Sequence, residues 1–287
     1  NYKDALSATG NRGVTRSYPH TPGIDAAGTI HWSGKQGLEK GDEVIVTGYD
    51  MGMNTPGGFG QYIRVPSDWI IKLPTGLTLK QSMILGTAGV TAGMSIFNLI
   101  KTIKPEQGKI LVTGASGGVG SLAVSILSKL GYSVTALSGK KDAAAFFETL
   151  GAKEVITREK LLEQSNRPLL KPQWAGAVDT VGGEILAAAI KSIHPLGVVT
   201  CCGNVASSDL PLTVFPFILR GVTLIGIDSQ NYPMKERKQI WANLSNDWKP
   251  VLFVQYHTEI SLNELNDAIQ EILKGRIKGR MLVNLDS

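Results

Sequence analysis

A glycine-rich segment in the middle of the chain constrains the fold more than any other feature. The apolar residues 110–112 precede Gly114, Gly117 and Gly120, and an apolar helical pattern follows. This spacing permits a tight turn, a close approach of the backbone to a pyrophosphate and close packing of the helix on a sheet. The start of the helix supplies unpaired N–H donors. The segment therefore predicts a dinucleotide-binding loop, with a glycine-rich turn that binds no ligand as the alternative.

Apolar strands alternate with helices after this segment begins, which predicts a parallel α/β sheet. We expect strands at 110–113, 134–137, 155–157, 177–180, 198–201 and 223–227, and helices at 119–130, 142–150, 184–192 and 235–247. Residues 1–84 contain short extended runs instead, at 24–30, 43–47 and 62–65, and these predict an irregular β domain. A helix at 262–274 and a strand at 281–285 are expected to return to that domain. We thus predict domains at 1–84, 85–254 and 255–287.

Composition excludes several classes of protein. The net charge of +5 comes without a basic cluster interleaved with aromatic residues, so we expect solvated faces and no nucleic-acid partner. Cys201 and Cys202 are adjacent, which gives no disulfide framework and favours a reducing, cytoplasmic location. The apolar run 110–127 is interrupted by glycines and hydroxyl residues, so we expect no membrane span.

The end of the second expected strand indicates which dinucleotide is bound. Enzymes that use NAD place an acidic residue there to bind the ribose 2′-hydroxyl. This chain has Ser138, Gly139, Lys140 and Lys141 instead. A serine and two lysines suit a 2′-phosphate, so the sequence predicts NADPH over NADH.

Two oxidoreductase families use a loop of this kind. The threonine before Gly114 resembles the short-chain dehydrogenases, which also carry a downstream Tyr-x-x-x-Lys motif. No tyrosine of this chain has lysine four positions later, and the loop begins more than 100 residues into the chain. We therefore reject the short-chain alternative.

Segments 1–4 (Asn-Tyr-Lys-Asp), 22–28 (Pro-Gly-Ile-Asp-Ala-Ala-Gly) and 86–93 (Gly-Thr-Ala-Gly-Val-Thr-Ala-Gly) resemble the medium-chain dehydrogenase/reductase superfamily, over essentially the entire chain. The resemblance implies a doubly wound Rossmann domain inserted in a GroES-like, mostly β catalytic domain. In metal-dependent members these segments carry the zinc ligands, and those positions fall here on Asn1, Ile24 and Thr87. None is a cysteine or histidine, so we expect no zinc site. The four histidines lack ligand spacing, and we expect them to be structural or exposed.

Within that superfamily, residues 1–4, 23–25, 112–120, 138–140 and 216–220 resemble the acrylyl-coenzyme A reductase group, formerly grouped with quinone oxidoreductases. The resemblance implies an N-terminal segment before Asn1 that supplies early strands of the β domain. It also implies an oxidoreductase that acts on an acyl-CoA, quinone or enone, and a homodimer formed through strand 223–227.

Without zinc to polarise a carbonyl oxygen, the acceptor should already be electrophilic at carbon. An α,β-unsaturated thioester, an enone and a quinone all meet this condition, because hydride adds to the β-carbon and hydrogen-bond donors stabilise the enolate. We expect reduction of an unsaturated acyl-CoA. An NADPH:quinone or enone oxidoreductase and a non-catalytic nucleotide-binding module are the alternatives.

The resemblance also implies roles for individual residues. Tyr2 is expected to contact the cofactor and donate to the substrate, and Asp4 and Asp25 to organise the pocket; a packing aromatic and turn or cap residues are the alternatives. Arg158 and Arg280 are expected near the cofactor, or as surface arginines. The other expected cofactor residues are Thr91, Ser116, Gly117, Gly118, Val119, Ser138, Gly139, Lys140, Gly203, Leu224 and Gly226; segment 224–228 could equally be a core strand.

Overall fold

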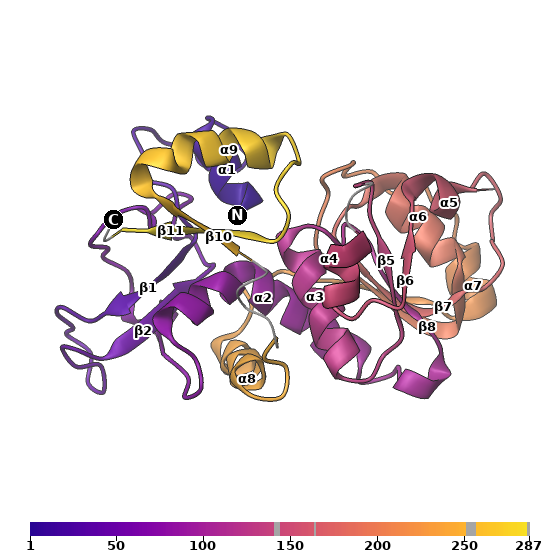
Figure 1. Cartoon of the computed structure of the whole chain (residues 1–287), viewed down its shortest axis with the longest axis horizontal. Helices are drawn as coiled ribbons and strands as arrows, with labels where there is room; N and C mark the ends of the chain where they lie inside the picture. The colour runs from indigo at the N-terminus through magenta and orange to yellow at the C-terminus, as the bar shows by residue number, and fades with distance from the viewer. Residues whose placement is uncertain (141–143, 164, 251–256, 286–287) are drawn as a thin grey trace. The chain divides into compact units, whose positions relative to one another are not determined.

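The computed structural model describes residues 1–140, 144–163, 165–250 and 257–285 (Figure 1). The chain divides into two compact units, of which the first comprises Asn1–Val90 and Ser229–Ser287 and the second Thr91–Asp228. Residues 229–250 thus pack with the first unit, whereas the predicted nucleotide-binding domain runs on to residue 254. Arg237 shows why, because its guanidinium donates to the backbone oxygen of Thr47 at 2.9 Å. The functional domain boundaries stay a prediction.

The second unit is built on a six-stranded parallel sheet, which confirms the expected Rossmann domain. Its strands are β4 (Ile110–Val112), β5 (Val134–Leu137), β6 (Glu154–Ile156), β7 (Trp174–Asp179), β8 (Ile193–Cys201) and β9 (Thr223–Gly226). They are ordered β6-β5-β4-β7-β8-β9. The strand order reverses beside β4, between β4 and β7, and in such sheets ligands bind outside the carboxyl ends of the strands at this point.

Helices cover both faces of this sheet, as a doubly wound fold requires. Figure 1 shows α3 (Gly118–Lys129) and α4 (Ala144–Thr149) on one side, and α5 (Arg158–Leu162), α6 (Gly183–Lys191) and α7 (Phe215–Arg220) on the other. Strands β4, β5 and β7 are buried along their whole length. Such continuous apolar strands are typical of a parallel sheet covered on both faces. The first residues of the helix expected at 142–150 lie outside the described residues.

The first unit holds two small sheets. Strands β1 (Asp25–Thr29), β2 (Glu43–Thr47) and β3 (Ile71–Lys72) are antiparallel, and β10 (His257–Ser261) pairs with β11 (Arg280–Asn284) in parallel. Helices α1 (Tyr2–Ala8) and α9 (Leu265–Leu273) pack against each other, and α8 (Met234–Ser245) completes the unit. The strand expected at 62–65 is wrong: this segment is irregular and Tyr62 is 80% exposed. Pro66 ends it, and a proline cannot donate to a strand ladder.

Helix α2 (Leu79–Leu99) is the longest helix described, and it is broken at Gly86, where φ is 49° and ψ is −155°. By length and composition alone α2 could cross a membrane, but 78% of its most apolar window is buried inside the structure. A core helix shows the same burial. We predicted no helix here, because the segment is apolar on all sides and contains three glycines, so it lacks helical periodicity.

Candidate active site

The glycine loop connects β4 to α3 in the second unit. Gly114 has a φ of +57°, and a Cβ there would lie 2.3 Å from Thr180 Oγ1. A Cβ at Gly120 would lie 2.4 Å from the backbone oxygen of Gly114. Both positions therefore require glycine, as the sequence spacing predicted.

The first turn of α3 is suited to bind an anion. Its N-cap is Gly117, which supplies no side-chain hydrogen bond to the helix. Among the described residues no side-chain cap occupies the N–H groups of the first turn, and the helix dipole favours negative charge at this end. The loop residues Ser116, Gly117, Gly118 and Val119 thus fit a pyrophosphate, which is the group the sequence implied.

The turn after β5 is small and open. Ser138 is buried, and its hydroxyl oxygen accepts a hydrogen bond from Lys140 N at 3.1 Å. A Cβ at Gly139 would meet no atom within 4 Å, so this side of the turn faces open space. Lys141 lies outside the described residues. The open space at Gly139 is thus room that a phosphate beside Ser138 and Lys140 would need.

The structure brings most of the expected cofactor residues of the second unit to one edge. Residues 116–119, 138–140, Arg158 and Gly203 all follow the carboxyl end of a strand, and parallel strands place those ends together. Arg158 is the first residue of α5 and is exposed. Leu224 and Gly226 instead lie within the edge strand β9, and Thr91 lies within α2.

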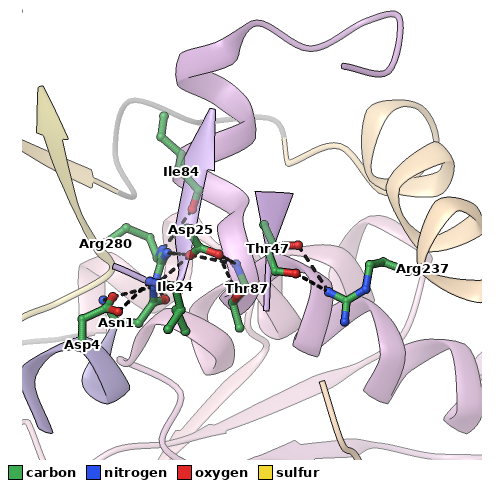
Figure 2. Close-up of polar contacts among 9 residues, drawn as sticks. All are labelled: Asn1, Asp4, Ile24, Asp25, Thr47, Ile84, Thr87, Arg237 and Arg280. Carbon is green, nitrogen blue, oxygen red and sulfur yellow. Dashed lines mark hydrogen bonds and ion pairs between the residues drawn. The ribbon is translucent and has the colours of Figure 1, made fainter. Parts of the chain in front are cut away.

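A buried polar cluster surrounds the break in α2 in the first unit (Figure 2). Asp25 accepts from the backbone N–H of Thr87 with both carboxylate oxygens at 2.9 Å, and from the Thr87 hydroxyl at 2.6 Å. It also accepts from the side-chain amide of Asn1 at 2.8 Å. Asn1 and Thr87 entered the sequence analysis only as positions without zinc ligands, and the structure shows them holding Asp25.

Arg280 completes the cluster. Its Nε donates to the backbone oxygen of Ile84 at 3.0 Å, and its Nη1 donates to Asn1 Oδ1 at 2.9 Å. Its Nη2 lies 3.6 Å from Asp25 Oδ2. Burial lowers the pKa of the guanidinium, and Asp25 and Asp4 oppose that shift. Arg280 is thus a buried member of this cluster rather than a surface arginine.

Asp4 and Tyr2 differ in whether their side-chain oxygens are already hydrogen-bonded within the protein. Asp4 Oδ1 accepts from the backbone N–H of Ile24 at 2.8 Å, and its Oδ2 accepts from Asn1 Nδ2 at 2.9 Å. The carboxylates of Asp4 and Asp25 are therefore already engaged, which favours positioning over proton transfer. The Tyr2 side chain is 39% exposed, and its hydroxyl has no hydrogen-bond partner among the described residues.

The donor set of the cluster suits hydrogen bonding better than metal binding. Among the described residues, no three histidine, cysteine, aspartate or glutamate side chains are grouped so as to hold a metal ion. The first unit also contains a cavity of about 1860 Å³, lined among others by Asp4, Asp25 and Arg280. Ligand pockets usually measure about 300 to 1000 Å³. We therefore do not assign the whole cavity to a substrate.

Comparison with known proteins identifies the class of protein. Residues 1–75 match the alcohol dehydrogenase GroES-like domain family, and residues 118–246 match the zinc-binding dehydrogenase family. The chain is 46% identical to the putative quinone oxidoreductase YhfP of Bacillus subtilis, over 99% of this chain and 87% of that protein. It is 43% identical to the probable acrylyl-CoA reductase AcuI of Escherichia coli, over 100% of this chain and 88% of that protein.

Solved structures agree with this assignment. The E. coli K-12 YHDH structure with bound NADPH has a TM-score of 0.95 and 43% identity, covering 99% of this chain and 87% of that one. The YhfP structure with NAD bound has a TM-score of 0.96 and 46% identity, with the same coverage. The chain belongs to the medium-chain dehydrogenase/reductase family of oxidoreductases, which confirms the resemblance noted in the sequence.

Proposed function

We propose that this chain is an NADPH-dependent reductase of the carbon–carbon double bond of α,β-unsaturated acyl-CoA thioesters. The observation that carries the proposal is the 43% identity, over the whole chain, to a protein named as a probable acrylyl-CoA reductase. The intact glycine loop and the anion-ready start of α3 support coenzyme binding. The substrate is thus the acryloyl-CoA type rather than an alcohol.

NADPH is the proposed coenzyme because the turn after β5 carries Ser138 and Lys140 where NAD enzymes carry an acid. The E. coli neighbour was solved with NADPH, and the B. subtilis neighbour with NAD. Selectivity for the 2′-phosphate is therefore a property to measure for this chain. Comparing kcat/KM for NADPH and NADH measures it directly.

The proposed reaction adds one hydride and one proton across the double bond. The bound reduced nicotinamide supplies the hydride. The thioester makes the β-carbon of the substrate electrophilic, so hydride addition there places negative charge on the carbonyl oxygen. A proton then reaches the α-carbon, and the products are the saturated acyl-CoA and NADP⁺. The Tyr2 hydroxyl is our proposed donor to the developing charge, since it is partly exposed and makes no hydrogen bond within the described part of the chain.

Asp4 and Asp25 are proposed as positioning residues for the segment that carries Tyr2. Asp4 lies on α1 with Tyr2, and its contact with the Ile24 backbone ties this helix to the start of β1. Asn1, which precedes α1, is held by Asp25 and Arg280. The cluster thus fixes the start of α1 and with it the position of the Tyr2 side chain.

The test is the rate of NADPH oxidation with acryloyl-CoA, crotonyl-CoA and 1,4-benzoquinone in wild type and Tyr2→Phe. We expect the highest kcat/KM with acryloyl-CoA and a loss of about 10²-fold in the variant, the size of one well-placed donor. Tyr62→Phe is the matched control, because Tyr62 is an exposed tyrosine of the same unit. Full activity of Tyr2→Phe on every substrate would remove Tyr2 from the mechanism.

A quinone or enone reductase is the second candidate, favoured by the 46% identity to a protein named as a putative quinone oxidoreductase. A higher kcat/KM for 1,4-benzoquinone than for acryloyl-CoA would select it. A nucleotide-binding module without catalysis would bind NADPH and reduce none of the three acceptors.

We further propose that two copies pair through the edge strand β9. Exposed apolar side chains precede this strand in the chain, since Val214, Ile218 and Leu219 on and before α7 are 62%, 67% and 63% exposed. An uncovered edge strand also presents unpaired backbone groups. Light scattering tests this proposal, and a monomer would refute it.

A further inference from the structure

A threonine and a buried aspartate join the ends of the two central strands of the parallel sheet. Thr113 directly follows β4, and Asp179 is the last residue of β7. The Thr113 hydroxyl donates to Asp179 Oδ1 at 2.6 Å, and both residues are fully buried. This hydrogen bond lies where the strand order reverses, so it connects the two loops that flank the crevice expected to bind a ligand.

The same two residues hold the loop that follows β7. Asp179 Oδ2 accepts from the backbone N–H of Gly182 at 2.9 Å and of Val181 at 3.2 Å. Thr180 N donates to the Thr113 hydroxyl oxygen at 3.0 Å, and Thr180 Oγ1 donates to the Thr113 backbone oxygen at 2.9 Å. Both loops are thus fixed to one carboxylate and to each other. We refer to Thr113, Asp179 and Thr180 as the clamp.

Close packing connects the clamp to the glycine loop. Gly114, the first glycine of the loop, lies directly against the clamp. A Cβ at this position would lie 2.3 Å from Thr180 Oγ1, so no side chain fits. A Cβ at Gly203, which follows β8, would lie 2.1 Å from the Thr180 backbone oxygen. The clamp therefore sets the position at which the glycine loop leaves the sheet.

Stability alone does not account for a carboxylate at this place. Burial raises the pKa of Asp179, and its hydrogen bonds with Thr113, Gly182 and Val181 oppose that shift. Apolar residues of similar volume often stabilise a core as well as or better than buried charges do. Networks that are fully hydrogen-bonded instead make a structure rigid and unique. A rigid loop binds a ligand through its N–H groups more tightly, because little conformational entropy is lost when the ligand binds.

We propose that Thr113 and Asp179 are positioning residues for the dinucleotide, which hold the glycine loop in its binding geometry without touching the ligand. The proposal rests on the coenzyme proposed above. Without the clamp, the donors at the start of α3 are still present, but the loop samples other positions. Binding then costs more, whereas hydride transfer from bound coenzyme is unchanged.

The decisive variant is Thr113→Val, which keeps the shape of the side chain and removes the hydroxyl. We expect the Kd for NADPH, measured by its fluorescence, to rise about tenfold, with kcat at saturating NADPH changed less than about twofold. Thr113→Ser should return the Kd to within about threefold of wild type, because it restores the donor. Thr135→Val is the matched control, since Thr135 is a buried threonine of the neighbouring strand β5 whose hydroxyl donates to Glu154 instead.

Hydrogen exchange without coenzyme separates this inference from the proposed function. The amides of residues 114–119 should exchange faster in Thr113→Val than in wild type and in Thr135→Val. If Thr113→Val does not fold, Thr113→Ala takes its place, because it puts no γ-methyl group where the hydroxyl faced the carboxylate. Unchanged exchange, or a Kd within about threefold of wild type, would overturn the inference. A wild-type protein that fails to bind NADPH would overturn the proposed function, and the exchange result would still decide the clamp's effect on the loop.

Discussion

Arg280 and Asp25 lie 3.6 Å apart beside the break in α2, and each binds a backbone group next to Gly86 (Figure 2). Arg280 Nε donates to the oxygen of Ile84, before the break, and Asp25 accepts from the N–H of Thr87, after it. A cation thus caps the end of one helical segment, and an anion caps the start of the next, as the helix dipole favours. The two residues are consequently caps as well as an ion pair.

The glycine at the break is required by both its backbone and its surroundings. A Cβ at Gly86 would lie 2.4 Å from Asp25 Oδ2 and 2.9 Å from Arg280 Nη2. We expect Gly86→Ala to lower the free energy of unfolding by about 2 to 4 kcal/mol, because it strains a left-handed backbone and displaces both caps. Urea unfolding measures the loss.

Gly10→Ala is the control for that substitution. Gly10 lies in the same unit with a φ of +86°, and a Cβ there would meet nothing within 4 Å. It should cost only the strain of the backbone, about 1 kcal/mol. Equal losses for the two variants would show that the contacts at Gly86 contribute nothing.

Removing the arginine should expose the cost of the buried cluster. Arg280→Met leaves the Asp25 carboxylate, Asn1 Oδ1 and the Ile84 oxygen without their cationic donor. We expect a loss of about 3 to 5 kcal/mol in the free energy of unfolding, typical of breaking a buried ion pair. Arg276→Met should cost about 0.5 kcal/mol, because Arg276 is exposed and pairs with Glu271 at the surface. A loss for Arg280→Met as small as that would contradict the cluster's structural role.

The turn after β5 should decide coenzyme choice. We expect Lys140→Ala to raise KM for NADPH about tenfold and leave KM for NADH unchanged, because only NADPH carries the 2′-phosphate. Lys153→Ala should change neither, since Lys153 is exposed at the opposite, amino-terminal edge of the sheet, just before β6. A parallel loss for both coenzymes would place Lys140 away from the 2′-phosphate.

Titration of Asp179, the buried aspartate of the clamp, should make the stability of the protein depend on pH. Burial raises the pKa of Asp179 above its ordinary value of 3.8, so the folded protein holds this proton more tightly than the unfolded chain. The stability gained from that proton is present below the ordinary pKa and is lost as the pH rises through the raised value. Asp179→Asn removes the titration. The difference between the urea midpoints of wild type and Asp179→Asn should therefore fall as the pH is raised from about 4 to about 7. A difference that stays constant over this range would contradict the raised pKa.

The sequence predicted the second unit well because local patterns determine its parts. Strand β4 is a continuous apolar run, β5 is apolar apart from Thr135, and Gly114 and Gly120 mark backbone positions that no other residue tolerates. Helix α2 was missed because its apolar residues follow no helical period, and Gly86 inside it resembles a turn. The prediction of a strand at 62–65 was wrong, because a short extended run in the sequence does not show whether a partner strand lies beside it.

The candidate site in the first unit could be predicted only in part. Tyr2, Asp4 and Asp25 were named from a family resemblance, but the cluster around Asp25 also includes the hydrogen bond between Asn1 and Arg280, which are 279 positions apart in the chain. Thr113 and Asp179 are 66 positions apart, and neither carries a local signal of the contact. Such contacts arise from tertiary packing and leave no periodicity or spacing to read.

The fate of the transferred hydrogen tests the central claim most directly. Acryloyl-CoA is incubated with the protein and NADPH deuterated at nicotinamide C4, on either face, and the product is analysed by mass spectrometry and NMR. The account predicts propanoyl-CoA with one deuterium on the β-carbon from one of the two labelled coenzymes. Product that carries deuterium elsewhere, or no product while 1,4-benzoquinone is reduced, would contradict it.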